Sequence, residues 1–126
     1  MSQNPEELMY AVTHEWVKLE EDNVIKVGIT DFAQEELGDL VFIELPEIGR
    51  QLATEEQCAV VESVKTASDL FSPVAGEVIA INESLVDAPE QVNEDAFNTW
   101  LFSLRIKSSD DLERLLDADG YEEAIS

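Results

Sequence analysis

Lys65 is the residue of this 126-residue chain whose type and position are best suited to chemistry. It lies in a polar stretch between the apolar run 59–61 and the apolar pair 70–71, where a hairpin tip is expected. A primary amine on a projecting tip can be acylated by a carboxylic cofactor, and its four-carbon stem lengthens the resulting arm. The other lysines are all expected inside strands (Lys18, Lys26 and Lys107). Spacing alone still favours the alternative that Lys65 is an ordinary solvated turn lysine.

Other reactive arrangements lack the residues they need. His14 is the sole histidine and Cys58 the sole cysteine, so neither a His-rich metal site nor a disulfide within the chain is expected. We interpret Cys58, in the apolar run 58–61, as a core residue and His14 as a surface or strand histidine whose hydrogen bonds are satisfied. The glycines are scattered, which argues against a phosphate-binding loop. The sequence therefore favours a protein that is not an enzyme and has no metal site.

Short strands must position the tip. The apolar alternation and turn residues predict strands at 13–19, 24–29, 40–45, 56–63, 67–72, 77–81 and 99–107. A short helix is expected over 31–37, where Thr30 or Asp31 can cap the start and Gly38 can end it. The polar segment 82–98 is expected to be a loop with at most one helical turn.

The last part of the chain is predicted to be helical over about 109–125. Leu112, Leu115 and Leu116 would share one face of this helix, and Ser108 or Ser109 would cap it. Because strands and helices do not alternate, a parallel sheet is not expected. We expect one mostly β domain over 1–126, with a core at about 10–107, a short internal helix and a C-terminal helical segment.

The charge of the chain restricts its partners. The 29 acidic and 7 basic residues give a net charge of -22, which repels nucleic acid and anionic membrane surfaces. No run of about 20 apolar residues occurs, and segment 1–7 lacks the features of a signal or transit peptide. We expect a monomer in the bacterial cytoplasm, or in the mitochondrial matrix if the chain is a processed organellar protein.

The string around Lys65 resembles the lipoylation site of the glycine cleavage system H proteins. Gly76 lies where that family places its next hairpin turn, in the matching stretch 72–78. Further segments resemble the family at 14–17, 27–34, 37–46, 92–95 and 115–118. The stretch 96–100 departs from the glycine-rich form common in the family. The residues of the attachment hairpin that carry the resemblance are Glu62, Ser63, Val64, Lys65, Thr66, Ala67, Ser68 and Asp69.

The resemblance implies a fold, a cofactor and a set of partners. The fold would be a barrel-sandwich hybrid, and Lys65 would carry lipoate in amide linkage, added by a lipoate-attaching enzyme. Glycine decarboxylase would load an aminomethyl group onto the lipoyl arm, and aminomethyltransferase would pass its methylene on to tetrahydrofolate. Dihydrolipoamide dehydrogenase would then reoxidise the arm. The chain itself would be a carrier, because the difficult chemistry belongs to the cofactors and partner enzymes.

A loaded arm would end in an amine that is cationic at neutral pH and must be kept from water. We hypothesise that the arm folds into a cleft where Glu15 and Asp69 hold this amine, with Thr13 and segment 30–37 as walls. These carboxylates lie in the matching segments and have the required charge. Ordinary surface acids remain the equal alternative.

Two other functions fit the attachment site. A lipoyl or biotinyl domain of another multienzyme complex is the first, although Val64 and Thr66 stand where a biotin carrier would have methionines. The second is an H-like protein that relays lipoate to other carriers or has a regulatory role. Activity with glycine decarboxylase would separate the glycine cleavage role from this relay.

Overall fold

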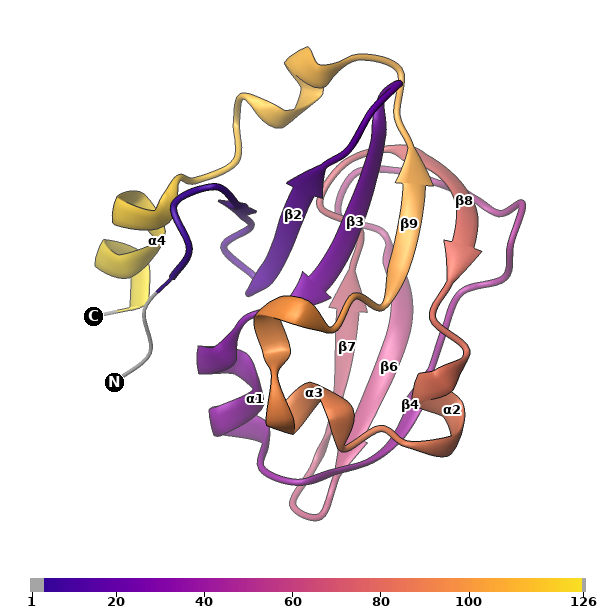
Figure 1. The fold of residues 1–126 in the computed structure, drawn as a ribbon, viewed down its shortest axis with the longest axis vertical. Helices are drawn as coiled ribbons and strands as arrows, with labels where there is room; N and C mark the ends of the chain where they lie inside the picture. The colour runs from indigo at the N-terminus through magenta and orange to yellow at the C-terminus, as the bar shows by residue number, and fades with distance from the viewer. Residues whose placement is uncertain (1–3, 126) are drawn as a thin grey trace.

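Two antiparallel sheets form the body of the computed structural model, which describes residues 4–125 (Figure 1). The larger sheet has the order β1-β2-β3-β9-β8-β5 and the smaller has the order β4-β6-β7. The start of segment 1–7 and Ser126 lie outside the described residues. The strands are β1 Met9–Tyr10, β2 Glu15–Leu19, β3 Val24–Ile29, β4 Leu40–Glu44, β5 Gln51–Leu52, β6 Gln57–Ser63, β7 Ala67–Phe71, β8 Gly76–Ile81 and β9 Phe102–Arg105.

The helices are short, and the predicted mostly β fold with a C-terminal helix is confirmed, but several short internal helices occur where one was expected. Helix α1 begins as predicted, because the side chain of Thr30 accepts a hydrogen bond from the N–H of Ala33, and it ends at Gly38. No helix within residues 4–125 is long and apolar enough to span a membrane. The helical elements are α1 Asp31–Leu37, α2 Ser84–Asp87, α3 Gln91–Glu94, η1 Ala96–Asn98, η2 Ser109–Leu112 and α4 Ala118–Ile125.

The prediction of one continuous helix over 109–125 was wrong. Only η2 and α4 are helical there, and the chain between them pairs with β1. The N–H of Leu116 donates to the carbonyl oxygen of Tyr10 over 2.8 Å, and the N–H of Tyr10 donates to the carbonyl oxygen of Leu116 over 2.8 Å. Backbone groups used for this pairing cannot also serve a helix.

Segment 82–98 is also more ordered than predicted. It contains α2, α3 and η1, each of which buries one apolar side chain: Leu85, Val92 and Ala96 respectively. The last strand starts at Phe102 and not at position 99, because the preceding residues belong to the loop that follows η1. Four-residue helices are too short to show a periodic pattern, so tertiary packing decides their formation.

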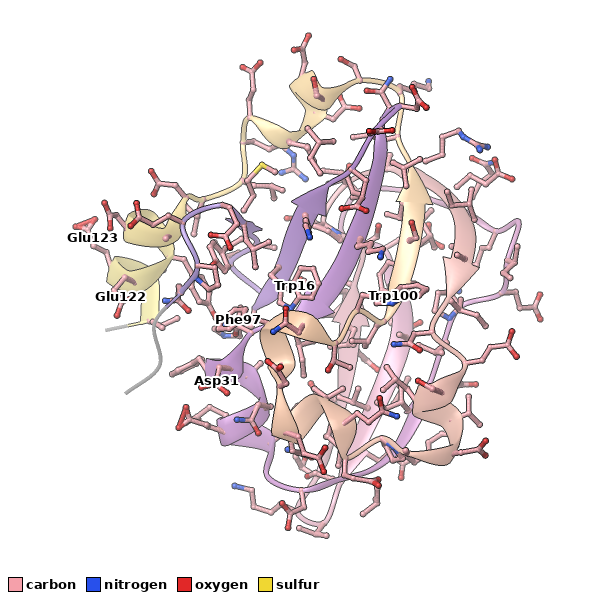
Figure 2. The ribbon with its side chains drawn as sticks, in the orientation of Figure 1. Trp16, Asp31, Phe97, Trp100, Glu122 and Glu123 are labelled. Carbon is pink, nitrogen blue, oxygen red and sulfur yellow. The ribbon has the colours of Figure 1, made fainter. Side chains whose placement is uncertain are left out.

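The main hydrophobic core lies between the two sheets, and a second cluster lies under α4. The second cluster stacks the rings of Tyr10 and Tyr121 with their centroids 4.8 Å apart. Trp16 completes it, and its indole N–H donates to the carbonyl oxygen of Ala96 over 3.0 Å. Cys58 is buried in the main core as predicted. In Figure 2, Glu122 and Glu123 lie on the outer side of α4, so this helix presents acids to solvent and aromatic residues to the core.

The hairpin of β6 and β7 projects from one end of the molecule, at the bottom of Figure 1. Its strands pair in register, with Val61 opposite Ser68 and Glu62 opposite Ala67. Val61 and Leu70 are buried at the base of the hairpin, where they join the main core. The residues between the strands therefore stand on a stiff base away from the body of the protein.

Candidate functional site

Lys65 occupies the tip of this hairpin, as predicted from its sequence. The N–H of Ser63 donates to the carbonyl oxygen of Thr66 over 2.7 Å, which closes the turn. The hydroxyl oxygen of Ser63 accepts hydrogen bonds from the N–H groups of Lys65 and Thr66, each over 3.1 Å. A serine at the first turn position is suited to this role, since its short side chain reaches the following amides. The backbone at Lys65 is thus fixed although its side chain is exposed.

The loop that follows α1 supports the tip. The N–H of Val64 donates to the carbonyl oxygen of Asp39 over 3.0 Å. Gly38 lies against the stem of Lys65, because a Cβ placed at position 38 would come within 3.2 Å of the lysine Cε. No ion pair of Lys65 is found within residues 4–125, so its amine is available for acylation.

Exposed apolar side chains surround the tip. Val64 is 69% exposed, and Val41 and Phe42 on the adjacent edge strand β4 are 56% and 46% exposed. Phe42 pairs with Glu62, three residues before the lysine. Exposed large apolar side chains grouped in this way are typical of a surface that contacts another protein.

A cavity of about 220 Å³ lies along the side of the hairpin, between β7 and α1. Its walls combine apolar side chains with a few polar groups, the composition expected of a small-molecule site. The carboxylates of Asp69 and Glu36 contribute from opposite elements. The lining residues are Thr13, His14, Ile29, Phe32, Ala33, Glu36, Leu37, Ser68, Asp69 and Leu70.

Two of the three residues expected to form the arm cleft, Thr13 and Asp69, line this cavity, and segment 30–37 forms one wall. Glu15 does not line it. It is only 1% exposed, and its carboxylate accepts hydrogen bonds from the hydroxyl of Thr13 and, over 3.2 Å, from the N–H of Phe71. Burial raises the pKa of Glu15 to about 7, although these hydrogen bonds act in the opposite direction. Glu15 is therefore linked to the cavity through Thr13.

His14 also lines the cavity, although no pattern in the sequence indicates this. It directly precedes β2 with φ 79, a left-handed conformation that is uncommon outside glycine. Its Nδ1 lies 2.8 Å from the hydroxyl of Tyr121, and its ring centroid lies 5.1 Å from that of Phe32. Burial lowers the pKa of His14, and the carboxylate of Glu36 opposes this shift. The hydrogen bond to Tyr121 agrees with a satisfied histidine, but the sequence identified neither this partner nor the contact with Phe32.

The position of Glu36 at the cavity wall was also not predicted, although the spacing of residues in α1 indicates it. Phe32 and Glu36 are four residues apart, as are Ala33 and Leu37, so all four lie on one face of α1. The cavity lies along this face. The four-residue spacing predicts that these side chains share one face of α1. Only the tertiary structure shows that this face is directed toward the hairpin of β6 and β7.

Within residues 4–125, no group of three or more His, Cys, Asp or Glu side chains is arranged to hold a metal ion. Cys58 is buried, and burial raises the pKa of its thiol to about 12, so little reactive thiolate forms near neutral pH.

Comparisons with known proteins agree with this geometry. Residues 8–126 match the family model described as glycine cleavage H-protein. The glycine cleavage system H protein of Aromatoleum aromaticum is 56% identical over 126 residues, covering 100% of this chain and 98% of that protein. The glycine cleavage system H protein 2 of Pseudomonas aeruginosa is 56% identical over 125 residues, covering 99% and 97%.

A solved structure supports the fold. The crystal structure of a glycine cleavage system H protein from Mycobacterium marinum superimposes with a TM-score of 0.88 at 36% identity, covering 95% of this chain and 97% of that chain. The sheets described above thus form the barrel-sandwich fold of lipoyl domains, as the resemblance to the family implied. With a family model covering nearly the whole chain and relatives of this similarity, the chain belongs to the glycine cleavage H-protein family.

Proposed function

We propose that this protein is the lipoyl carrier of a glycine cleavage system and that Lys65 bears the lipoate. The observation that carries the proposal is the placement of Lys65, exposed at a hairpin tip whose backbone is fixed by Ser63 and Asp39. An enzyme can enclose such a lysine without unfolding the sheet. Lipoate, once joined to Lys65, supplies the sulfur atoms that carry the aminomethyl group of glycine.

The cavity beside the hairpin has the size and chemistry to shelter that arm. Asp69 lies in β7, four residues after Lys65, so the backbone between them spans at most about 13 Å, which is comparable to a lysine stem lengthened by an acyl chain. Apolar side chains such as Leu37 and Leu70 suit the hydrocarbon of the arm, and Thr13 and Asp69 provide polar groups at the wall. The donor set and shape therefore fit a lipoyl group that carries a cationic end.

Within this cavity, Asp69 is the residue that would face the amine directly. Glu15 would act behind it, by accepting the hydrogen bond of the Thr13 hydroxyl and so orienting the oxygen of Thr13. This assignment refines the expectation that Glu15 and Asp69 hold the amine together. The lone pair of an unprotonated amine can expel the lipoyl sulfur and so release the aminomethyl group, whereas a protonated amine has no lone pair for this. A cavity wall that favours the ammonium form therefore keeps the aminomethyl group, the cargo of the arm, on the lipoyl sulfur.

The protein itself would not catalyse a reaction. Its role would be to present one group in turn to glycine decarboxylase, aminomethyltransferase and dihydrolipoamide dehydrogenase, after a lipoate-attaching enzyme has modified Lys65. The bacterial relatives support a cytoplasmic location. The charge of -22 favours partners with basic surfaces over nucleic acid and membranes.

The lipoate-attaching enzyme is the partner we assign to the apolar surface formed by Val41, Phe42 and Val64. This enzyme must take the amine of Lys65 into its active site, so it must contact the side chains that flank the tip. Three exposed acidic residues surround this surface: Asp39, Glu44 and Glu62. We therefore expect basic residues around the active-site entrance of the lipoate-attaching enzyme.

The test of the function compares Lys65→Arg with Lys18→Arg, which alters an exposed lysine in β2. Both variants and the unchanged protein would be treated with the lipoate-attaching enzyme and measured by intact mass, then assayed for glycine cleavage with the three partner enzymes. We expect Lys65→Arg to gain no lipoyl mass and to support no glycine cleavage, while Lys18→Arg behaves as the unchanged protein. Full activity of Lys65→Arg would overturn the proposal.

The same assay addresses the relay alternative. A carrier that only donates lipoate to other proteins would take up lipoate at Lys65 and yet receive no aminomethyl group from glycine decarboxylase. We expect loading by glycine decarboxylase, detected as an added mass on the arm after incubation with glycine.

A further inference from the structure

His14, Tyr121 and Thr30 form a chain of hydrogen-bonding groups that ends at the wall of the arm cavity. Nδ1 of His14 lies 2.8 Å from the hydroxyl oxygen of Tyr121, which lies 2.7 Å from Oγ1 of Thr30. Oγ1 of Thr30 also accepts the N–H of Ala33 over 3.2 Å, as the cap of α1. Three elements that are distant in sequence, the β1–β2 loop, the start of α1 and α4, thus meet at one hydroxyl group.

This series of hydrogen bonds uses only one of the two ring nitrogens of His14. With Nδ1 engaged by Tyr121, no described residue makes a hydrogen bond to Nε2 of His14, and the residue lines the cavity with Phe32. A neutral imidazole carries one donor and one acceptor, so the partner of Nδ1 decides which of the two Nε2 presents. The desolvation that lowers the pKa of His14 favours this neutral form.

The hydrogen bonds that join Thr30, Tyr121 and His14 can run in either donor-to-acceptor direction without movement of any heavy atom. If Thr30 donates to Tyr121 and Tyr121 donates to Nδ1, then Nε2 carries the proton and is a donor. If Nδ1 carries the proton and donates to Tyr121, and Tyr121 donates to Thr30, then Nε2 is an acceptor. Thr30 can serve either way, because its hydroxyl has one proton and two lone pairs.

We propose that His14 binds the loaded arm, with Nε2 accepting a hydrogen bond from its terminal ammonium, and that Tyr121 is the positioning residue that sets the required tautomer. The inference rests on the proposed function, because the ammonium is present only on an arm that carries the aminomethyl group. No bond to carbon or sulfur changes in this step. Where the empty site has its proton on Nε2, the imidazole exchanges one proton with solvent water as the cationic donor arrives: Nε2 loses it and Nδ1 gains it. The hydroxyls of Tyr121 and Thr30 then rotate, so that Tyr121 accepts from Nδ1 and donates to Thr30.

The surroundings of His14 agree with a cationic ligand. Glu36 on α1 and Asp69 on β7 are the carboxylates of the cavity wall, and Tyr121 on α4 faces the other side of the ring. His14 keeps a left-handed backbone, which costs free energy and persists only where the surrounding structure imposes it. A neutral acceptor between two carboxylates can bind an ammonium without adding a positive charge.

The test uses the fact that His14 is the sole histidine of the chain, so labelling histidine with ¹⁵N gives signals from one ring only. Spectra would be recorded for three forms at one pH: unmodified, lipoylated, and loaded by glycine decarboxylase with glycine, each verified by intact mass. We expect the unmodified and lipoylated forms to agree, and Nε2 to show the resonance of an unprotonated, hydrogen-bonded ring nitrogen in the loaded form.

Each other outcome has a definite meaning. A protonated Nε2 in a form whose loading is verified would overturn the role of His14 while leaving the proposed function intact. A change on lipoylation alone would assign the contact to the dithiolane ring and overturn the ammonium assignment. Failure to load by mass would overturn the proposed function and, with it, this inference.

Two matched variants test Tyr121. Tyr121→Phe keeps the stacked ring and removes the hydroxyl that contacts His14, whereas Tyr10→Phe removes the hydroxyl of the other ring, which donates to Pro5. Loss of one hydrogen bond should raise the rate at which cargo is lost to water about fivefold in Tyr121→Phe. Tyr10→Phe should retain both the cargo lifetime and the His14 spectrum. Equal behaviour of the two variants would overturn the positioning role.

His14→Asn provides a direct check, since asparagine tolerates a left-handed backbone. We expect cargo loss to rise by a similar factor, about fivefold for one hydrogen bond. If this variant fails to fold, the spectra of the unchanged protein and the two tyrosine variants still decide the proposal.

Discussion

The stem of Lys65 lies against the backbone of Gly38, and a Cβ at position 38 would come within 3.2 Å of the lysine Cε. Gly38 has φ 86 and ψ -162, a backbone conformation occupied almost only by glycine. The residue therefore serves two purposes, since it ends α1 and leaves room for the base of the arm. This relationship connects the helix that lines the cavity with the lysine that would carry the lipoate.

Gly38→Ala should lose stability and also slow attachment of lipoate. The strained backbone should cost about 1 to 3 kcal/mol in the free energy of unfolding, measured by urea denaturation. Gly49→Ala is the matched control, because Gly49 also has a positive φ of 96 but a Cβ added there would meet no atom within 4 Å. Only Gly38→Ala should lower the rate of lipoylation. Equal rates for the two variants would show that the contact with Lys65 has no effect on attachment.

Glu15 should make the protein less stable as the pH rises toward neutrality. Burial raises the pKa of Glu15 from 4.5 to about 7, so between these values the folded state holds a proton that the unfolded state has released. The folded state then binds more protons, and the free energy of unfolding falls with increasing pH until the folded carboxyl has ionised above about pH 7.

Glu15→Gln removes this titration. We expect the stability of the variant to gain about 2 kcal/mol relative to the unchanged protein between about pH 5.5 and about pH 8.5. Thermal or urea unfolding across this range measures the difference. Glu62→Gln, which removes a carboxyl at an exposed position, is the control variant. A constant difference between Glu15→Gln and the unchanged protein would contradict the role assigned to burial.

Gly28→Ala should be among the most damaging small substitutions. Its Cβ would lie 2.5 Å from Cε2 and Cζ2 of Trp16, the residue paired with it across β2 and β3. Displacing the buried indole should cost about 2 to 3 kcal/mol through overpacking. The double variant Gly28→Ala with Trp16→Phe should recover part of this loss relative to Trp16→Phe alone, measured as a coupling energy. Simple additivity of the two changes would argue against the contact.

Phe42→Ser should weaken recognition by the lipoate-attaching enzyme without unfolding the protein. Phe42 is 46% exposed on β4 beside the tip, so its loss removes apolar contact area from the assigned docking surface. We expect kcat/KM for lipoylation to fall about tenfold, as for loss of an apolar side chain at an interface. Ile48→Ser, which alters a side chain 60% exposed in the turn after β4, should have little effect. A similar fall for both variants would contradict a local docking site.

The sequence by itself determined the position of Lys65 at a hairpin tip. Its primary amine, the turn-forming Ser63 and the apolar residues on both sides specify an exposed tip on a stiff hairpin, and short-range turn geometry depends only on neighbouring residues. The cap of α1 at Thr30 and its end at Gly38 were readable for the same reason. The burial of Cys58 followed from the apolar run that contains it.

Only the tertiary structure decided how the cavity is built. The contact between His14 and Tyr121 joins residues 107 positions apart, and no local pattern encodes such a pair. The same holds for the pairing of Tyr10 with Leu116, which interrupts the predicted C-terminal helix. The burial of Glu15 depends on β7 closing over β2, so its raised pKa is a property of the fold and not of the segment around it. Long-range packing therefore decides which side chains meet at the cavity wall, while local sequence decides which lysine lies at the hairpin tip.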